Sequence, residues 1–507
     1  MGLKDVWKNK NGCVKEEDAL FVSTRGAGAV SAAEAVLRGL APDGGLYADP
    51  GITGRPFDVQ SCLALEPLGQ AERILSHLLP GFPDMGGLVR RAYEGRFSSE
   101  ELTPLVPVGD EYVLELFHGP TAAFKDVALC MLPQLMTAAR ELTGMREKTV
   151  ILTATSGDTG KAALEGFHDV PGTGIIVFFP YQGVSKVQEM QMLTQEGKNV
   201  AVCAVKGNFD DCQSAVKAVF SSFPDGKAAP GVRLSSANSI NIGRLAPQVV
   251  YYFLAYASLL RRGKIRYGEA VDYVVPTGNF GDILAGWYAK QLGLPVGKLV
   301  CASNANRVLT DFLETGVYDR RRSFYKTSSP SMDILISSNL ERLLYYASGC
   351  NAENVRNDML RLQSSGYYKI SAGELRRIQE DFSAYCCSEE ETAASIRRCF
   401  DETGYLPDTH TAVALHAARQ YREKEKREIP LVVLSTASPF KFPAAVLAAL
   451  GKESEGDAFQ QMEQLARVSG LSVPPALGSL REKPLIHGDV IEKADIADYV
   501  KQTLEKL

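Results

Sequence analysis

One lysine, Lys125, could act as a covalent catalyst. It lies in the segment His118-Gly-Pro-Thr-Ala-Ala-Phe-Lys-Asp126, and an apolar helical stretch runs onward from Val127. A lysine at the edge of an apolar segment usually extends its ammonium group into water. If the lysine is desolvated instead, its amine loses its proton and can form an imine with an aldehyde. The surrounding residues therefore decide which role Lys125 has.

A glycine-containing loop, Gly278-Asn-Phe-Gly-Asp282, separates a predicted strand from a predicted helix. Backbone N–H groups and the helix dipole can bind a phosphate at such a place. The pattern also occurs in plain tight connections, and Asp282 would put a negative charge beside the phosphate. Neither G-x-G-x-x-G nor G-x-x-x-x-G-K-[ST] occurs in the chain, so nucleotide-binding folds lose their main support.

A second loop, Thr155-Ser-Gly-Asp-Thr-Gly160, offers hydroxyl groups and backbone donors at the start of a predicted helix. This arrangement suits a small carboxylate, although a Ser or Asp there can equally be a plain helix N-cap. The two loops and Lys125 occur together in one α/β chain, and this combination favours a catalytic lysine.

The cysteines and histidines show no metal-binding pattern. Cys386 and Cys387 are adjacent, and no C-x-x-C pair occurs among the ten cysteines. We expect no metal ion, and reduced thiols as in a cytosolic protein. His410, in Asp408-Thr-His-Thr411, is expected to cap the following helix. The other histidines without metal-ligand spacing are His77, His168, His416 and His487.

From about residue 99 onward, apolar strands alternate with amphipathic helices, which predicts a mostly parallel sheet covered on both faces. Strands are predicted at 149–153, 175–179, 200–205, 273–275 and 431–434, and helices from 161, at 186–196, at 212–220 and at 287–291.

The pattern also divides the chain into segments. Residues 1–98 are irregular and turn-rich, with Pro42-Asp-Gly-Gly45 as a turn signal, and form a predicted N-terminal domain. Residues 99–450 form the predicted catalytic core. Within it, a helical insertion is expected at about 303–407, where patterns such as 339–348 and 372–386 dominate. Residues 451–507 are expected to form a C-terminal extension over the core.

Composition limits the possible partners. With 507 residues, 45% of them hydrophobic, the chain is long enough for two or three packed units. A net charge of -5 gives no electrostatic reason to expect nucleic acid or an anionic membrane. The first twenty residues lack the apolar run of a signal peptide, and the most apolar stretch, 249–260, is shorter than the roughly 20 residues of a membrane span. We expect a soluble, cytoplasmic protein.

Seven segments, in order along residues 21 to 450, closely resemble those of threonine synthases, in particular the longer bacterial and fungal type. The segment around Lys125 resembles the family's cofactor-lysine segment. The seven are Ser23-Thr-Arg-Gly26, Leu40-Ala-Pro-Asp-Gly-Gly-Leu-Tyr47, Glu115-Leu-Phe-His-Gly-Pro-Thr-Ala-Ala-Phe-Lys-Asp126, Thr153-Ala-Thr-Ser-Gly-Asp-Thr-Gly160, Asn238-Ser-Ile-Asn-Ile-Gly-Arg244, Pro276-Thr-Gly-Asn-Phe-Gly-Asp282 and Leu434-Ser-Thr-Ala437.

The resemblance implies a pyridoxal 5'-phosphate (PLP) enzyme of fold type II, similar to the tryptophan synthase β-subunit, with two open, mostly parallel sheets covered by helices. It implies that Lys125 is the catalytic residue and binds the cofactor covalently. Thr436 would donate a hydrogen bond to the pyridine nitrogen, where other PLP folds place an aspartate; alternatively, its hydroxyl bonds to backbone at a strand end. The residues implied around the cofactor phosphate are Gly278, Asn279, Phe280, Gly281 and Asp282.

The implied substrate is O-phospho-L-homoserine, which water would convert to L-threonine and phosphate. Its second anionic group requires another cationic site, for which arginine is the best-shaped residue. For His118, a structural hydrogen-bonding role is the alternative. The candidate substrate-binding residues are Thr155, Ser156, Asp158, Thr159, Lys161, Arg244 and His118.

The chain departs from some relatives after Ala437. It continues Ser438-Pro-Phe-Lys-Phe442 where those relatives have His-Pro-Ala-Lys-Phe, and residues 1–20 match nothing in the family pattern. One alternative is a threonine synthase-like phospho-lyase that releases a 2-oxoacid, ammonia and phosphate. Another is a catalytically silent PLP-binding protein, which the intact Lys125, glycine loop and Thr436 argue against. We expect a monomer or homodimer.

Overall fold

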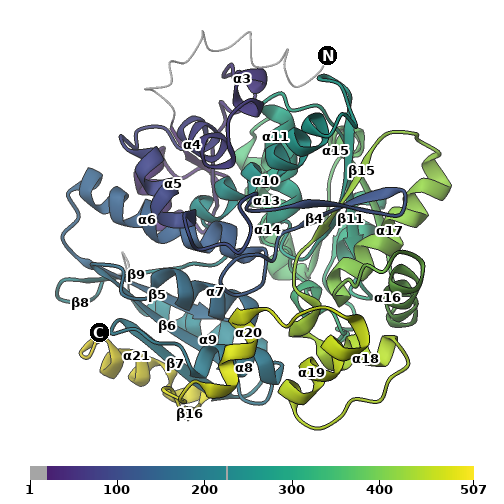
Figure 1. Cartoon of the computed structure of the whole chain (residues 1–507). Helices are drawn as coiled ribbons and strands as arrows, with labels where there is room; N and C mark the ends of the chain where they lie inside the picture. The colour runs from purple at the N-terminus through teal and green to yellow at the C-terminus, as the bar shows by residue number, and fades with distance from the viewer. Residues whose placement is uncertain (1–19, 224–226) are drawn as a thin grey trace.

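The strands form two six-stranded sheets, each mostly parallel (Figure 1). The computed structural model describes residues 20–223 and 227–507. In the first sheet, with the order β14-β11-β10-β15-β4-β3, only the β3–β4 pair is antiparallel. Its strands are β3 (Leu105–Val108), β4 (Glu111–Glu115), β10 (Val271–Pro276), β11 (Val296–Ser303), β14 (Phe382–Cys386) and β15 (Leu431–Ser435).

The second sheet has the order β16-β7-β6-β5-β9-β8, and only its β8–β9 pair is antiparallel. Every residue of β6 is buried, as expected for a central parallel strand covered on both faces. The strands predicted from the sequence are confirmed as β5, β6, β7, β10 and β15. The second sheet consists of β5 (Lys148–Ala154), β6 (Thr173–Pro180), β7 (Val200–Lys206), β8 (Lys227–Ala229), β9 (Val232–Ser235) and β16 (Asp489–Glu492).

Two small antiparallel pairs stand apart from these sheets: β1 (Val22–Ser23) with β2 (Tyr47–Ala48), and β12 (Val317–Asp319) with β13 (Tyr367–Lys369). Helices surround all the sheets. They are α2 (Ala32–Arg38), α3 (Val59–Leu63), α4 (Pro67–Leu78), α5 (Met85–Tyr93), α6 (Lys125–Thr143), α7 (Asp158–Phe167), α8 (Lys186–Leu193), α9 (Phe209–Ser222), α10 (Ile242–Arg261), α11 (Gly281–Gln291), α12 (Val308–Thr315), α13 (Leu340–Ala347), α14 (Ala352–Ser365), α15 (Ala372–Asp381), α16 (Glu389–Thr403), α17 (Thr409–Glu425), α18 (Pro443–Ala449), α19 (Ala458–Ser469), α20 (Pro475–Gly478) and α21 (Ile496–Leu504).

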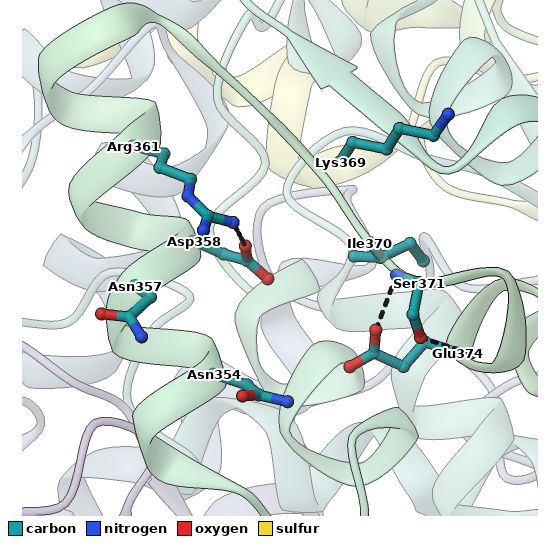
Figure 2. A pocket seen from close by; sticks show the side chains of 8 residues that line it. All are labelled: Asn354, Asn357, Asp358, Arg361, Lys369, Ile370, Ser371 and Glu374. Carbon is teal, nitrogen blue, oxygen red and sulfur yellow. Dashed lines mark hydrogen bonds and ion pairs between the residues drawn. The ribbon is translucent and has the colours of Figure 1, made fainter.

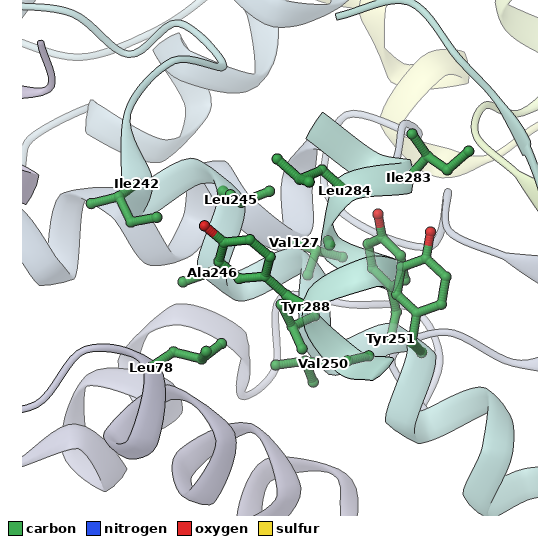
Figure 3. Close-up of a cluster of buried hydrophobic side chains, with 14 of the residues drawn as sticks. Leu78, Val127, Ile242, Leu245, Ala246, Val250, Tyr251, Ile283, Leu284 and Tyr288 are labelled. Carbon is green, nitrogen blue, oxygen red and sulfur yellow. The ribbon is translucent and has the colours of Figure 1, made fainter. Parts of the chain in front are cut away.

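Helix α10 lies at the centre of the largest hydrophobic cluster. Its residues from Ile242 to Leu259 are all buried, and they include nearly all of the most apolar stretch of the sequence, 249–260. It packs against α4, α6 and α11, and Figure 3 shows Leu78 of α4 and Leu284 of α11 among the side chains around it. Because α6 begins at Lys125 and α11 begins at Gly281, this core fixes the relative positions of the candidate lysine and the candidate phosphate loop.

Two features of the segments outside the alternating core were not predicted from the sequence. The described part of residues 1–98 contains regular helices beside its turns, because α2, α4 and α5 each bury one apolar face, with Val36, Leu75 and Val89 almost fully enclosed. The tail after residue 451 also contributes a strand to a sheet of the core. Its strand β16 pairs with β7 in parallel and extends the second sheet at that edge.

The insertion also contains a strand that the sequence did not predict. The helical pattern at 372–386 ends at Asp381, and Phe382–Cys386 is strand β14, which pairs with β11 at the edge of the first sheet. The helix predicted at 339–348 is confirmed as α13.

Within the two described ranges, no helix has both the length and the apolar character that a bilayer crossing requires. The segment used to argue against a signal peptide, residues 1–19, lies outside the described residues.

Candidate active site

A cavity of about 270 Å³ lies at the carboxyl ends of β5, β10 and β15, so both sheets contribute to it. In open α/β sheets this is the usual position for a ligand. Its lining includes Lys125, Ser156, Arg244, Gly278 and Thr436. The structure therefore brings together residues from five of the segments that were singled out in the sequence.

Lys125 is the first residue of α6, and only 9% of its surface is exposed. The preceding turn is fixed by Asp126, whose carboxylate accepts hydrogen bonds from Thr121 N at 2.8 Å and Thr121 Oγ1 at 2.6 Å. Burial lowers the pKa of the Lys125 amine, Asp158 opposes this shift, and the positive charges of Lys441 and Arg244 add to it. A lowered pKa leaves more of the amine unprotonated and nucleophilic.

Asp158 lies between two lysines. Its Oδ2 is 3.9 Å from Lys125 Nζ, and its Oδ1 is 2.7 Å from Nζ of Lys441, which is fully buried. Gln188 Nε2 also donates to Oδ1, at 2.9 Å. Burial alone would raise the pKa of Asp158, but Lys441 and Lys125 hold it far below its usual value. Asp158 therefore keeps its negative charge beside Lys125.

Lys441 lies in the divergent segment Ser438-Pro-Phe-Lys-Phe442, and no role was predicted for it from the sequence. The signal available was a lysine in an otherwise apolar stretch, because such a residue needs a buried anionic partner. Its Nζ also donates to the carbonyl of Thr121 at 3.0 Å, which connects it to the turn before Lys125.

The loop before α11 has the properties of an anion site. The backbone N–H groups of Gly278, Asn279 and Phe280 donate to no other group in the described residues. Phe280 is the N-cap of α11 and adopts a left-handed φ of 65°, while its buried ring packs on Phe382. A Cβ at Gly278 would lie 2.5 Å from the carbonyl oxygen of Ser331. Free donors at a helix N-terminus and a glycine imposed by close packing both suit a phosphate.

The other two residues of that loop line the cavity in different ways. A Cβ at Gly281 would meet its nearest neighbour, Asn339 Nδ2, at an ordinary 3.4 Å. Burial raises the pKa of Asp282 to about 6. This carboxyl group therefore repels a nearby phosphate less than a surface aspartate would.

Thr436 follows β15 and is joined to the lysine segment by backbone pairing. Its carbonyl accepts a hydrogen bond from Phe124 N at 2.8 Å, and Ala437 forms a β-bridge with Ala123. The hydroxyl of Thr436 bonds to no other group in the described part of the chain, although the residue is only 5% exposed. The backbone-bonded alternative is therefore not what the structure shows, and the hydroxyl is available to a ligand.

The hydroxyl groups of the loop after β5 have two different roles: one fixes the local backbone, and the others line the cavity. Thr155 Oγ1 accepts hydrogen bonds from Gly157 N at 3.0 Å and Gly160 N at 2.8 Å, so it fixes the start of α7. Ser156 and Thr159 are half-buried and line the cavity beside that helix N-terminus, where a carboxylate would be stabilised.

Arg244 lines the cavity from the first turn of α10. It is 3% exposed, and its Nη1 donates to the carbonyl of Ala237 at 2.5 Å. Its Nε has no hydrogen-bond partner, and no carboxylate pairs with it in the described residues. Burial lowers the pKa of Arg244 to about 10, which still leaves the guanidinium charged at neutral pH. An uncompensated buried cation facing a cavity is suited to an anionic ligand.

Two candidate substrate residues lie outside the cavity. Lys161 Nζ is held by Glu165, at 3.0 Å, and by Gln195. His118 bonds to Glu115 Oε2 at 2.8 Å and to Ser98 Oγ at 3.2 Å, as the structural alternative required. Because their polar groups are already bonded elsewhere, neither residue is proposed as a substrate contact.

The cap of α17 is not the residue that the sequence suggested. Asp408 is the N-cap, and its carboxylate accepts hydrogen bonds from the backbone N–H groups of His410 and Thr411. His410 instead lines the cavity. Its Nδ1 lies 2.6 Å from Asp408 Oδ2, and its Nε2 accepts from Ser331 N at 3.1 Å.

A second, smaller hollow of about 190 Å³ lies between α14 and the start of α15 (Figure 2). Three of its charged groups are already engaged: Arg361 bonds to Asp358, and Glu374 accepts hydrogen bonds from Ser371 in a helix capping box. Lys369 also lines this hollow, but no glycine loop or buried unpaired guanidinium accompanies it as in the larger cavity.

The pattern described as "Pyridoxal-phosphate dependent enzyme" matches residues 99–436, and that described as "Threonine synthase, C-terminal" matches residues 411–484. The threonine synthase of Pseudomonas aeruginosa is 39% identical over 432 residues, which cover 84% of this chain and 89% of that protein. The chain belongs to the threonine synthase family of PLP-dependent enzymes.

Human "Threonine synthase-like 1" is also similar, at 38% identity over 504 residues that cover 95% of this chain. This chain spans only 65% of that protein's length. Among solved structures, PLP-bound threonine synthase from Brucella melitensis is 40% identical with a TM-score of 0.84, over 96% of this chain and 99% of that one. The expected fold type II is confirmed, and pyridoxal phosphate is the cofactor.

The residues of this threonine synthase family member fit that cofactor. Lys125 offers a buried amine of lowered pKa, and the loop at Gly278 offers free N–H donors for a phosphate. The hydroxyl of Thr436 is free for a ring nitrogen and lines the same cavity.

Proposed function

We propose that this protein converts O-phospho-L-homoserine and water into L-threonine and phosphate. One observation carries the proposal: beside the candidate lysine, the cavity is lined by two groups that could each bind an anion, the free N–H donors of the Gly278 loop and the guanidinium of Arg244. The Gly278 loop suits the cofactor phosphate, and the unpaired guanidinium of Arg244 suits a second one. Because the cofactor accounts for the first phosphate, a substrate with its own phosphate group accounts for the second.

We assign the substrate's carboxylate to the N-terminal end of α7. Ser156 and Thr159 line the cavity there, and the helix dipole favours a negative charge. Asp158, although predicted as a substrate contact, carries a negative charge already paired with Lys441. Its proposed role is therefore electrostatic, toward Lys125.

Bound pyridoxal phosphate supplies the electron sink that stabilises negative charge on the substrate carbon next to the amine. Lys125 Nζ removes the proton from that carbon, and its lowered pKa leaves more of the amine unprotonated to do so. Asp158, 3.9 Å away, stabilises the ammonium group that Lys125 then carries. Arg244 binds the substrate phosphate and stabilises its charge as the bond to the γ-carbon breaks.

Three further features belong to the proposal. We propose that residues 99–450 form the catalytic unit, between segments 1–98 and 451–507. We propose a cytoplasmic location, which is supported by the lack of a disulfide among the described cysteines. The proposed assembly is a monomer or homodimer.

The test is to incubate the purified holoenzyme with O-phospho-L-homoserine and identify the products by mass spectrometry. We expect L-threonine and phosphate in equal amounts. Formation of 2-oxobutanoate, ammonia and phosphate would instead show a phospho-lyase, and an absence of phosphate release would contradict both activities.

A further inference from the structure

Away from the active site, three potential metal ligands from distant parts of the chain lie together. Cys387 directly follows β14, Glu391 is in the first turn of α16, and His416 is in the middle of α17. The Cys387 Sγ, a Glu391 carboxylate oxygen and a His416 ring nitrogen all lie within 4.8 Å of one another. No sequence pattern predicts this cluster, because His416 is brought to the other two residues by the packing of α16 against α17.

The orientation of each side chain favours a shared ligand. Glu391 is held by the capping box of α16, in which its Oε2 accepts from Ser388 N at 2.8 Å. Its Oε1 faces His416 Nε2 at 3.5 Å. That nitrogen is shielded from solvent and has no hydrogen-bond partner among the described residues. A buried ring nitrogen without a hydrogen bond is unfavourable, and a metal ion would satisfy it.

We propose that Cys387, Glu391 and His416 form a binding site for a zinc-type divalent cation. Thiolate, imidazole and carboxylate are the three donor types that Zn²⁺ uses, and three protein ligands leave a fourth position for water. Zinc–ligand bonds of about 2.0–2.3 Å require ligand atoms closer together than the 4.8 Å limit, so the three side chains would have to draw together around the ion.

Cys387 is enclosed in the protein and has few polar neighbours. It is 2% exposed, and the hydrogen bonds of its Sγ among the described residues are with Thr392 Oγ1, at 3.3 Å, and the carbonyl of Ser388, at 3.4 Å. The acidic residues Glu389 and Glu391 at the start of α16 add negative charge that favours the cation.

The site is separate from the catalytic cavity but shares a helix with it. His410 lines the cavity, and His416 lies six residues later on α17, about 9 Å along the helix axis at 1.5 Å per residue. A bound cation would tie the start of α16 to α17 without contacting substrate. We therefore expect it to stabilise the protein and to leave the basal activity unchanged.

The test uses Co²⁺ as a spectroscopic probe on the holoenzyme freed of other metals. We expect one Co²⁺ per chain, with the visible ligand-field bands of a tetrahedral site. Cys387→Ser and His416→Gln should each lose these bands and bind at least tenfold more weakly. The matched control is Cys399→Ser, because Cys399 is a cysteine of α16 that lies outside the cluster. This variant should retain the visible bands.

Circular dichroism and cofactor absorbance show whether each variant is folded, and Glu391→Gln provides a second, partly exposed position if Cys387→Ser does not fold. Failure of the wild-type protein to bind Co²⁺ would overturn the proposal. So would equal binding by wild type, His416→Gln and Glu391→Gln, since the cluster would then be an ordinary His–Glu ion pair beside a buried thiol. The outcome does not depend on the identity of the substrate.

Discussion

Lys441 and Asp158 form an enclosed ion pair, with 2.7 Å between Nζ and Oδ1 and almost no exposure of either side chain. The second oxygen of Asp158 points toward Lys125 Nζ. The charge on the candidate base therefore depends on a lysine that does not itself line the cavity.

Replacing Lys441 should change both stability and the titration of Lys125. Lys441→Met leaves a buried carboxylate without its main cation, at a cost of about 3–5 kcal/mol in the free energy of unfolding. It also removes a charge that lowers the pKa of Lys125, so that pKa rises. In protein stripped of cofactor, the variant should therefore need a higher pH than the wild type to rebind PLP at the same rate.

Two variants serve as controls for this shift. Lys441→Arg keeps the charge and should rebind PLP with a nearly unchanged pH profile. Asp158→Asn removes a charge that raises the pKa of Lys125, so its profile should move to lower pH. Shifts in the same direction for Lys441→Met and Asp158→Asn would show a merely structural role.

Arg244→Ala should lower kcat/KM specifically for a phosphorylated substrate. Loss of a hydrogen bond to a charged group costs about 1.5–3 kcal/mol, which corresponds to roughly 10- to 100-fold in kcat/KM. O-acetylhomoserine lacks the phosphate, so any slow reaction with it should be unaffected. An equal loss on both substrates would mean that Arg244 supports only the fold.

The two loop glycines should differ in their importance for cofactor retention. A side chain at Gly278 collides with the backbone of Ser331, whereas one at Gly281 first meets Asn339 at an ordinary contact distance. Gly278→Ala should therefore lose PLP during gel filtration more readily than Gly281→Ala. Gly281→Val brings bulk close to the cofactor phosphate and should recover part of its turnover with excess PLP. Unchanged retention in all three variants would indicate an ordinary connection.

Thr436→Ala removes the hydroxyl assigned to the cofactor ring. A lost neutral hydrogen bond costs about 0.5–1.5 kcal/mol, and more if the ring nitrogen remains buried and unpaired. Both PLP affinity and turnover should fall, and Thr436→Ser should restore most of each. Wild-type behaviour of the alanine variant would refute the assignment.

The sequence predicted those parts of the fold that local patterns determine. Strands such as β6 and β10 contain the apolar runs 175–179 and 273–275, because parallel strands are buried on both faces. By contrast, β14 follows α15 with no turn residue between them, and exposed β16 carries acidic residues at both ends. Their pairing with β11 and β7 depends on tertiary contacts that no local pattern reports.

In the candidate site, too, local sequence patterns predicted the residues within motifs but not their tertiary contacts. Lys125, the Gly278 loop and Thr436 were recognisable because each lies in a compact motif. The buried partner of Asp158 was not, because Lys441 reaches it from a remote segment. Lys161 was placed near the substrate by its proximity in sequence to the Ser156 loop, yet its side chain pairs with Glu165, one helical turn onward.

Lys125 is the residue to which PLP is proposed to bind covalently, and the proposed chemistry requires it. The decisive measurement is reduction of the holoenzyme with borohydride, followed by proteolysis and mass spectrometry of the labelled peptide. We predict that the visible absorbance is bleached and that the pyridoxyl mass lies on Lys125, with no such label in Lys125→Ala. A label on a different lysine, such as Lys441, would contradict the assignment of the catalytic residue.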